Sequence, residues 1–224
     1  IGLMFSRRTL NAQEEKFCNI HSWVVDEKFR SQSLFLLLPV MKLKGYTLTM
    51  FTGSKEVYAA AKKLGFQDLE SNYQIILPLP SVLTWLTPCQ IEVNGKYLDE
   101  TLAGEALQAY RDHLSFRCFH AHIRSSLGDC YLVGTRVSRK NLPFAQIHHL
   151  SNSEVFVKFA GRIAAAICFQ IKTVAMATDQ RFLRGNTVPM SLAWPLPNSR
   201  VYKSSSLGKN DIDLLYSEYP ALNI

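Results

Sequence analysis

The stretch from Phe17 to Phe66 decides the fold class, and it reads FCNIHSWVVDEKFRSQSLFLLLPVMKLKGYTLTMFTGSKEVYAAAKKLGF. Residues 17–25 are rich in aromatic and β-branched residues and predict a strand, as do residues 46–51. Between them, Ser33–Lys44 is a leucine-rich run that predicts a buried helix, with its proline near a kink or an end. Lys55–Leu64 predicts a second helix, which Ser54 caps and Gly65 follows. This order of elements indicates a mixed α/β fold.

The rest of the chain shows the same alternation of patterns. We expect further strands at Gly2–Arg8, Tyr73–Leu77, Phe116–Arg124, Asp129–Val137, Pro143–Leu150, Lys172–Ala177 and, as a late edge strand, Ser199–Lys203. The expected helices are Leu98–Leu114, as an inserted element, and a segment that Ser153 caps and that continues to about Phe169. The proline-containing residues 78–97 predict a connector packed against the body.

An internal repeat is a second feature of the pattern. Phe17–His21 matches Phe144–His148, and each is followed at nearly the same distance by a similar strand, Tyr46–Met50 or Lys172–Met176. Chance similarity between two strand–helix–strand segments is the alternative. If the repeat is real, the chain holds a first half at 1–80, a connector with an inserted helix at 81–115, and a second half or completion of the fold at 116–224.

Composition limits the class of protein. The 224 residues are 47% hydrophobic and 19% charged, which is typical of a globular chain. The longest apolar run, Leu34–Met41, is too short to cross a bilayer, and no signal sequence opens the chain, so we expect a cytoplasmic protein without a membrane partner. The five cysteines form no CxxC pair and predict buried, reduced thiols. No cluster of residues predicts a metal site.

Residues 17–70 resemble the central part of the GNAT N-acyltransferase superfamily. In that family a strand ending in valine leads into a basic turn, Arg/Gln-x-x-Gly-x-Gly/Ala, that opens a helix, and the matching residues here are WVVDEKFRSQSLF at 23–35. The second match is the helix Glu56–Lys63, which continues into Leu64-Gly65-Phe66. The resemblance implies a GNAT-like mixed central sheet flanked by helices, with a second GNAT-like half later in the chain.

The resemblance also implies a site for acetyl-CoA or another acyl-CoA, used as a substrate. Free backbone N–H groups and the helix dipole favour an anion at a helix start, so the pyrophosphate would lie across Arg30–Leu34. The pantetheine arm would pair with the backbone of the preceding valines. The implied binding residues are Val24, Val25, Arg30, Ser31, Gln32, Ser33, Leu34, Ser54 and Tyr58.

Four positions depart from the family pattern. Ser33 and Phe35 replace the two small residues of the turn, where glycine would let a phosphate approach the backbone. Ala61 stands where the family often has a tyrosine, and Tyr58 lies one turn earlier, while Ser54 replaces a preferred asparagine. These changes affect the predicted activity more than the predicted fold.

The catalytic base is the least defined part of the site. His21 is the candidate, because its strand leads into the cofactor turn and histidine titrates near neutrality, although a hydrogen-bonded strand histidine is the simpler interpretation. His148 and His149 are weaker candidates, because adjacent residues of a strand face opposite sides. Glu154 is interpreted as a capping carboxylate at a helix start.

Three functions are therefore open. The first is an acyl-CoA-dependent N-acyltransferase, in which an amine of a small molecule or peptide attacks the thioester directly. The second is an inactive GNAT-fold binding or scaffold protein, which is favoured by Phe35, by Ala61 and by the absence of the Arg-x-x-Gly turn from the second half. The third is a nucleic-acid-binding protein, but the residues behind the net charge of +7 are scattered and form no basic stripe, which argues against it.

Overall fold

The protein divides into two compact units. The computed structural model describes residues 1–10, 13–80, 84 and 86–222. Unit 1 comprises Ile1–Ser71 with Pro197–Ile212, and unit 2 comprises Asn72–Leu196 with Asp213–Ile224. Each unit therefore draws on two separate stretches of the chain. This division differs from the consecutive segments that the sequence suggested, because the late residues 197–212 return to the first unit.

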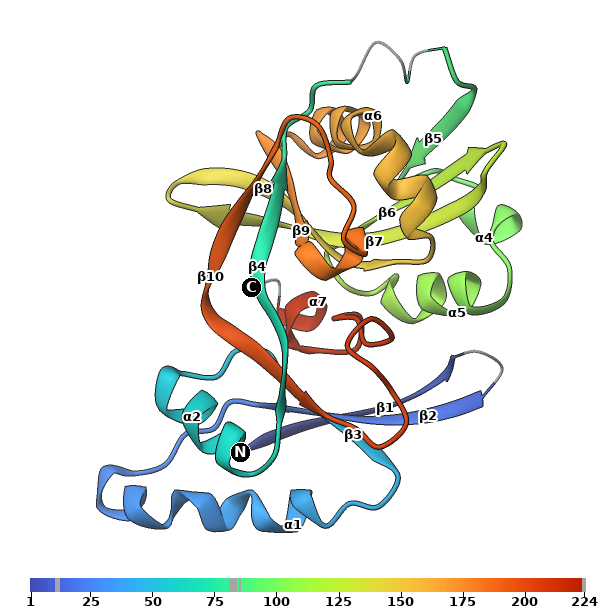
Figure 1. Ribbon diagram of the computed structural model, residues 1–224. Coiled ribbons are helices and arrows are strands. Elements are labelled where there is room, and N and C mark those ends of the chain that lie inside the picture. The colour runs from blue at the N-terminus through green and yellow to red at the C-terminus, as the bar shows by residue number, and fades with distance from the viewer. Residues whose placement is uncertain (11–12, 81–83, 85, 223–224) are drawn as a thin grey trace. The chain divides into compact units, whose positions relative to one another are not determined.

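The described residues contain ten strands in one mixed sheet, paired in the order β1-β2-β3-β10-β4-β9-β8-β7-β6-β5 (Figure 1). The pairs β2–β3 and β8–β9 are parallel. Strands β4 and β10 each contribute residues to both units. The strand bounds are β1 Gly2–Leu10, β2 Gln13–His21, β3 Tyr46–Met50, β4 Gln67–Ile76, β5 Cys89–Val93, β6 Cys118–Ser125, β7 Gly128–Arg139, β8 Leu142–Leu150, β9 Ala175–Asp179 and β10 Ser191–Lys203. The predicted mixed sheet flanked by helices is confirmed.

Unit 1 carries three helical elements, η1 (Glu27–Leu36), α1 (Leu38–Met41) and α2 (Lys55–Lys63). Helix α2 begins as predicted, because the Ser54 hydroxyl accepts a hydrogen bond from the backbone N–H of Val57. It ends before Gly65, whose φ of +83° suits glycine. The core of the unit includes Cys18, Ile20, Leu48, Met50, Ala61 and Phe66.

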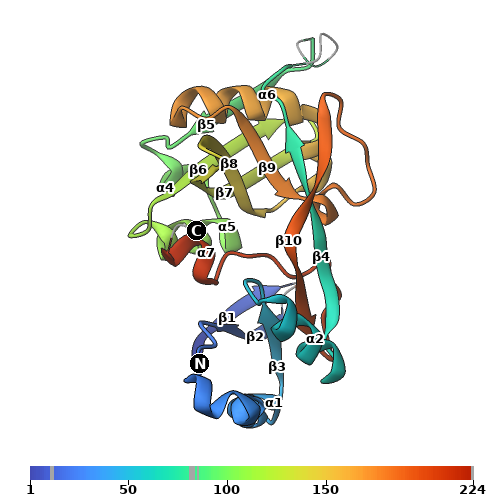
Figure 2. The same ribbon diagram turned by 90° about the vertical axis from the view of Figure 1, so that its left-hand side faces the viewer.

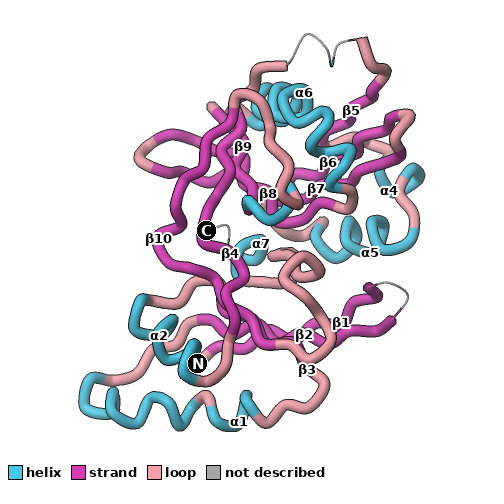
Figure 3. The backbone as a smooth tube through the Cα atoms, in the orientation of Figure 1, coloured by secondary structure: helices cyan, strands magenta, loops and turns pink. Residues whose placement is uncertain are grey.

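The connection from β2 to β3 differs from the prediction. Residues 33–44 do not form one buried helix, because a 3-10 helix ends at Leu36 and a short α-helix begins at Leu38 (Figure 3). Pro39 lacks a backbone N–H and its ring would clash with the carbonyl four residues earlier, so it favours the start of a new helix, and it lies in the first turn of α1. Leu37 and Val40 are buried, whereas Phe35 is 67% exposed. Strand β2 also ends earlier than expected, at His21 rather than Val25, and Ser22 turns the chain with a φ of 50°.

Unit 2 places helices on both faces of its strands (Figure 2). Helix α6 (Ser153–Ile171) buries Phe156, Phe159, Ile163 and Ile167, which recur at helical spacing, against the sheet. The opposite face is covered by α4 (Leu98–Thr101) and α5 (Gly104–His113), which pack on Tyr131 and Val133 of β7. Further helical elements among the described residues are η2 (Gln180–Leu183) and α7 (Glu218–Leu222). Among the described helices, none is both long and apolar enough to cross a membrane.

Four sequence predictions for unit 2 and its neighbouring strands were wrong in detail. The expected connector at 78–97 contains β5, and the expected helix at 98–114 is two helices, separated before Gly104 with its φ of +54°. Asn152, not Ser153, caps α6. The late strand is not an edge strand, because β10 lies between β3 and β4.

Candidate functional site

The candidate base of unit 1, His21, lies at the end of β2. Its Nδ1 is 2.9 Å from the hydroxyl oxygen of the neighbouring Ser22. Across the β1–β2 pair it faces Gly2, and a Cβ at that glycine would come within 2.5 Å of the imidazole ring. The ring thus packs over Gly2, which supports the simpler interpretation of a strand histidine.

The predicted phosphate turn of unit 1 lies on η1 and the segment before it. Val24 is 80% exposed, Arg30, Ser31, Gln32 and Leu34 are exposed, and Ser33 is half-buried. The carboxylate of Asp26 accepts a hydrogen bond from the backbone N–H of Lys28, at 3.2 Å. A negative charge therefore stands at the start of η1, about one turn before Arg30–Leu34, where the coenzyme A phosphates were expected.

The two predicted site residues on the α2 side have local partners. The Ser54 hydroxyl donates to a carboxylate oxygen of Glu56 at 2.6 Å. The Tyr58 hydroxyl donates to Asp68 at 2.8 Å, and this hydrogen bond raises the pKa of Tyr58. Lys62 binds the other oxygen of Asp68 at 2.9 Å. The assignment of all these residues to an acyl-CoA site stays a prediction.

In unit 2, the parallel strands β8 and β9 separate partway along their length. Phe144, Ala145 and Gln146 pair with Ala175, Met176 and Ala177. Beyond this point β8 continues beside β7 as far as Leu150, whereas the last residues of β9, Thr178 and Asp179, pair with β4. The strands therefore diverge where β8 approaches the start of α6.

A β-bulge at His148 accompanies this divergence. Gly134 of β7 pairs with Ile147 and the preceding Val133 pairs with His149, so His148 is the extra residue. Gly134 permits this close approach, because a Cβ there would lie 2.3 Å from the carbonyl oxygen of Gln146. The expected alternation of the two histidines is consequently wrong, and both reach the face that α5 covers. His148 Nε2 lies 2.8 Å from the hydroxyl of Thr135.

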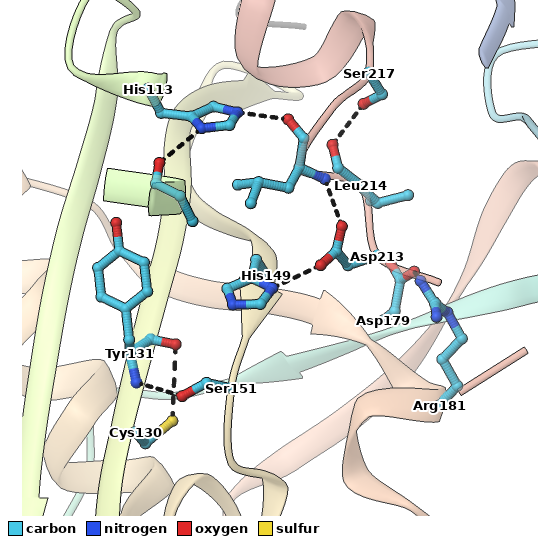
Figure 4. Close-up of polar contacts among 12 residues, drawn as sticks. His113, Cys130, Tyr131, His149, Ser151, Asp179, Arg181, Asp213, Leu214 and Ser217 are labelled. Carbon is cyan, nitrogen blue, oxygen red and sulfur yellow. Dashed lines mark hydrogen bonds and ion pairs between the residues drawn. The ribbon is translucent and has the colours of Figure 1, made fainter. Parts of the chain in front are cut away.

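His149 forms an ion-pair geometry with a carboxylate from the last part of the chain (Figure 4). Its Nδ1 lies 2.6 Å from Oδ2 of Asp213, and Oδ1 of Asp213 accepts from the backbone N–H of Leu215 at 3.0 Å. The two side chains are 15% and 10% exposed. Leu214 N–H also donates to the carbonyl of His148 at 3.0 Å, so residues 213–215 lie directly beside the bulge.

Five of the six histidines of the chain gather on this side of the unit: His113, His120, His122, His148 and His149. His113 lies between the carbonyl oxygens of Ala109 and Leu215, at 2.8 and 2.7 Å (Figure 4). Carbonyl oxygens only accept hydrogen bonds, so each of these two contacts depends on a hydrogen carried by the facing ring nitrogen. His113 therefore links α5 to the segment that contains Asp213.

The ring of His120 is held in its neutral form. Burial, with a further contribution from the charge of His113, lowers the pKa of His120 to about 4. The neutral ring pairs with the Tyr131 hydroxyl, at 2.8 Å from Nδ1. Burial also raises the pKa of Tyr131, so its hydroxyl stays protonated and can donate to His120. His120 and Tyr131 are thus a neutral, buried pair beneath the more accessible His149.

A pocket of about 850 Å³ opens at the start of α6. Asn152 caps the helix, since its amide oxygen accepts from the backbone N–H groups of Glu154 and Val155. Two cations, Lys158 and Arg184, stand against one carboxylate, Glu154. The lining residues are Thr87, Ser126, Leu127, Asn152, Ser153, Glu154, Val157, Lys158, Arg184 and Asn186.

The cysteines show no sign of nucleophilic chemistry. All five are free thiols within the described residues. Burial raises the pKa of Cys18 and Cys118 to about 11 and that of Cys130 to about 12, which keeps them protonated at neutral pH. The interpretation as buried, reduced thiols is confirmed for Cys18, Cys130 and Cys168, while Cys89 and Cys118 are half-buried.

The unit 2 site was only partly visible in the sequence. The pair His148–His149 is visible, but nothing in the sequence announces the bulge that turns both side chains the same way. Asp213 lies 64 positions after His149, so their contact depends on the path of the chain. The cations of the pocket, Lys158 and Arg184, belong to different elements and form no motif. Asn152 directly before Ser153-Glu154 was the one local signal available, because asparagine is a strong N-cap residue.

Comparison with known proteins identifies the fold. The structure is similar to a GCN5-related N-acetyltransferase from Anabaena variabilis, with a TM-score of 0.50 and 9% identity over 89% of this chain and 57% of that chain. A protein of unknown function from Enterococcus faecalis, described as a probable N-acyltransferase, gives a TM-score of 0.48 and 11% identity over 89% and 57% of the two chains. The N-myristoyltransferase of Saccharomyces cerevisiae with bound myristoyl-CoA gives a TM-score of 0.45 and 8% identity over 96% and 70%.

The chain spans 57% of the length of the first two of these proteins. At such low identity, the likeness to the Anabaena protein concerns the fold alone, and it confirms the GNAT-like fold that the sequence resemblance implied. No protein-family model matches the chain, and no curated protein matches it significantly in sequence.

Proposed function

We propose that the protein is an acyl-CoA-dependent N-acyltransferase whose acyl-CoA site lies in unit 2. The observation that carries this proposal is the divergence of β8 from β9 at a bulge, next to a pocket at the start of the following helix. A strand that separates from its parallel neighbour and leads into a helix start is the arrangement that the family resemblance associates with coenzyme A.

The pocket at the start of α6 suits the phosphates of coenzyme A. Its volume of about 850 Å³ lies within the range of ligand pockets, which is about 300–1,000 Å³. Lys158 and Arg184 supply positive charge, and the hydroxyl of Ser153 and the amide of Asn186 can donate hydrogen bonds. The N-terminal end of α6 adds the favourable field of the helix dipole.

The thioester would lie near His149. The chain from His149 to Asn152 covers three residues, or about 10 Å when extended, and so connects the histidine with the pocket. With the phosphates in the pocket, the pantetheine arm follows this segment. An amine then attacks the thioester carbonyl directly, and backbone N–H groups stabilise the oxyanion.

Unit 1 supports this function less well. The first turn of each helix contains one glutamate, Glu27 or Glu154, but the cap of η1 is the carboxylate of Asp26, whereas the neutral Asn152 caps α6. We infer that unit 1, which also contains a parallel strand–helix–strand segment, is a second copy of the same plan that serves as scaffold. Acetyl-CoA as the acyl donor, an amine of a small molecule or peptide as acceptor, and a cytoplasmic location remain parts of the proposal.

A second candidate function is a non-catalytic binding protein on the same fold. It is favoured by the hydrogen bond from Leu214 N–H to the carbonyl of His148, since the last part of the chain here uses backbone of β8 that an acyl-CoA could otherwise approach. Binding of acyl-CoA without acyl transfer to any amine would support this alternative.

Calorimetric titration with acetyl-CoA and longer acyl-CoAs tests the site. Arg184→Ala or Lys158→Ala should weaken binding about tenfold, because a charge-assisted hydrogen bond contributes about 1.5–3 kcal/mol. Arg30→Ala in unit 1 is the matched control and should leave the affinity unchanged. The opposite result would place the site at the turn that the sequence predicted, and no binding of any acyl-CoA at saturating concentration would contradict the proposed function.

A further inference from the structure

The feature of unit 2 that the acyl-CoA site leaves unexplained is the His149–Asp213 pair. Its partners come from β8 and from residues 213–215, and their atoms are 2.6 Å apart. The backbone N–H of Leu215 holds the second carboxylate oxygen at 3.0 Å, which fixes the orientation of Asp213. At 15% and 10% exposure, the side chains are shielded from bulk water but are not sealed from it.

The hydrogen bond fixes which ring nitrogen of His149 can act as a base. A carboxylate only accepts hydrogen bonds, so Nδ1 of the neutral ring carries the hydrogen and Nε2 carries the lone pair. This is the arrangement in which a carboxylate orients a histidine and stabilises the imidazolium that forms when Nε2 takes a proton.

The position of the pair agrees with such a role. His149 directly follows the bulge, on the length of β8 that has left β9 and leads to the pocket. Ionisable groups close to it among the described residues include Tyr131, whose ring centre lies 6.1 Å away, His148 next to it in β8, and Asp213 itself. Tyr131 is kept neutral by burial, and Nε2 of His148 lies against the hydroxyl of Thr135, whereas Nδ1 of His149 faces the carboxylate of Asp213.

We propose that His149 is the proton acceptor of the acyl transfer and that Asp213 positions it, an inference that rests on the proposed function. The nitrogen of a neutral amine forms a bond to the thioester carbonyl carbon, and the bond from that carbon to sulfur breaks. The amine proton passes to Nε2 of His149 and then, directly or through water, to the departing thiolate. The products are an amide and the free thiol of coenzyme A, and His149 is neutral again.

The experiment measures acyl transfer from acetyl-CoA to lysine, spermidine and a short peptide, with the released thiol and the amide quantified by mass spectrometry. His149→Gln should lower kcat at least about 100-fold, as expected for the loss of a general base, and should remove the acid limb of the pH profile. The acetyl-CoA affinity should change less than twofold. Asp213→Asn should have a smaller effect on kcat, and added imidazole should partly restore His149→Ala.

His122 and Asp129 provide the matched control, because they form a second histidine–carboxylate pair, at 3.3 Å, on β6 and β7. His122→Gln should retain the wild-type kcat and pH profile. A wild-type kcat and pH profile in both His149→Gln and Asp213→Asn would overturn this proposal while leaving the proposed function intact. If the wild-type protein binds no acyl-CoA, the proposed function fails and this inference fails with it.

Discussion

The two units contain the same strand–helix–strand sequence of elements but build it differently. In unit 1, β2 pairs with β3 from Lys16 to Asn19, and in unit 2, β8 pairs with β9 from Phe144 to Gln146. Both first strands continue past their parallel partner. In unit 1 the register of β1 and β2 is regular to His21, whereas in unit 2 the bulge at His148 interrupts the register of β7 and β8. The difference shows that one extra residue can convert a strand end into a candidate site.

The connecting helices differ for a related reason. Helix α6 is 19 residues long, rich in alanine and isoleucine, and capped at Asn152. The corresponding segment of unit 1 contains Ser31, Ser33 and Pro39, which favour turns or interrupt helices, and it forms a 3-10 helix and one short α-helix. A long, buried helix holds its N-terminal end rigidly. The comparison therefore favours unit 2 as the place where a ligand is bound.

The largest expected difference between the units is the loss of stability of unit 2 at acidic pH. The pKa of His120 is about 4 in the folded protein, against about 6.5 for an ordinary histidine. Below pH 6.5 the unfolded chain binds a proton that folded unit 2 does not, so stability is full above pH 6.5 and is lost as the pH falls toward 4. The loss amounts to about 3 kcal/mol. Urea unfolding between pH 7.5 and 4.5 measures it.

The control for this prediction is a pair of conservative variants. His120→Gln should flatten the pH dependence of the free energy of unfolding, whereas His21→Gln in unit 1 should not change it. An equal slope in His120→Gln and the wild type would show that another group causes the loss.

A substitution of Gly134 tests whether the bulge is responsible for the proposed acyl-CoA binding of unit 2. Gly134→Ala places a Cβ against the carbonyl oxygen of Gln146, and overpacking of this kind costs about 1–3 kcal/mol. We expect a lower unfolding free energy and weaker acetyl-CoA binding, measured by urea unfolding and calorimetry. Gly208→Ala in unit 1, where the nearest contact is 3.4 Å away, is the control. Unchanged acetyl-CoA affinity in a destabilised Gly134→Ala protein would separate the bulge from the site.

The helix caps give the smallest expected difference. Asn152 accepts from two backbone N–H groups, at 3.1 and 3.2 Å, whereas Ser54 accepts from one, at 3.4 Å. Asn152→Ala should cost about 1 kcal/mol of unfolding free energy and Ser54→Ala only a few tenths. Urea unfolding of both variants checks this order, and a larger loss in Ser54→Ala would contradict the view that α6 has the firmer start.

Much of the fold could be predicted from local patterns. Strands β1, β3, β6, β7 and β8 and helices α2 and α6 occur close to their predicted positions, because hydrophobic period and cap residues act over a few neighbours. The place of β10 between β3 and β4 could not be predicted, since pairing depends on residues far apart in the chain. The strand predicted at residues 17–25 ends early, at His21, because Ser22 turns the chain directly after it.

The candidate site, like the fold, could be predicted from the sequence only in part. The sequence by itself determined the GNAT-like plan, the run of helix α6 after β8, and the presence of two adjacent histidines at the end of that strand. Only the tertiary structure decided that His148 and His149 share one face, because the bulge depends on how Gly134 of a neighbouring strand approaches Gln146. Only the tertiary structure brought Asp213 to His149, because the last part of the chain returns to unit 2 after passing through unit 1.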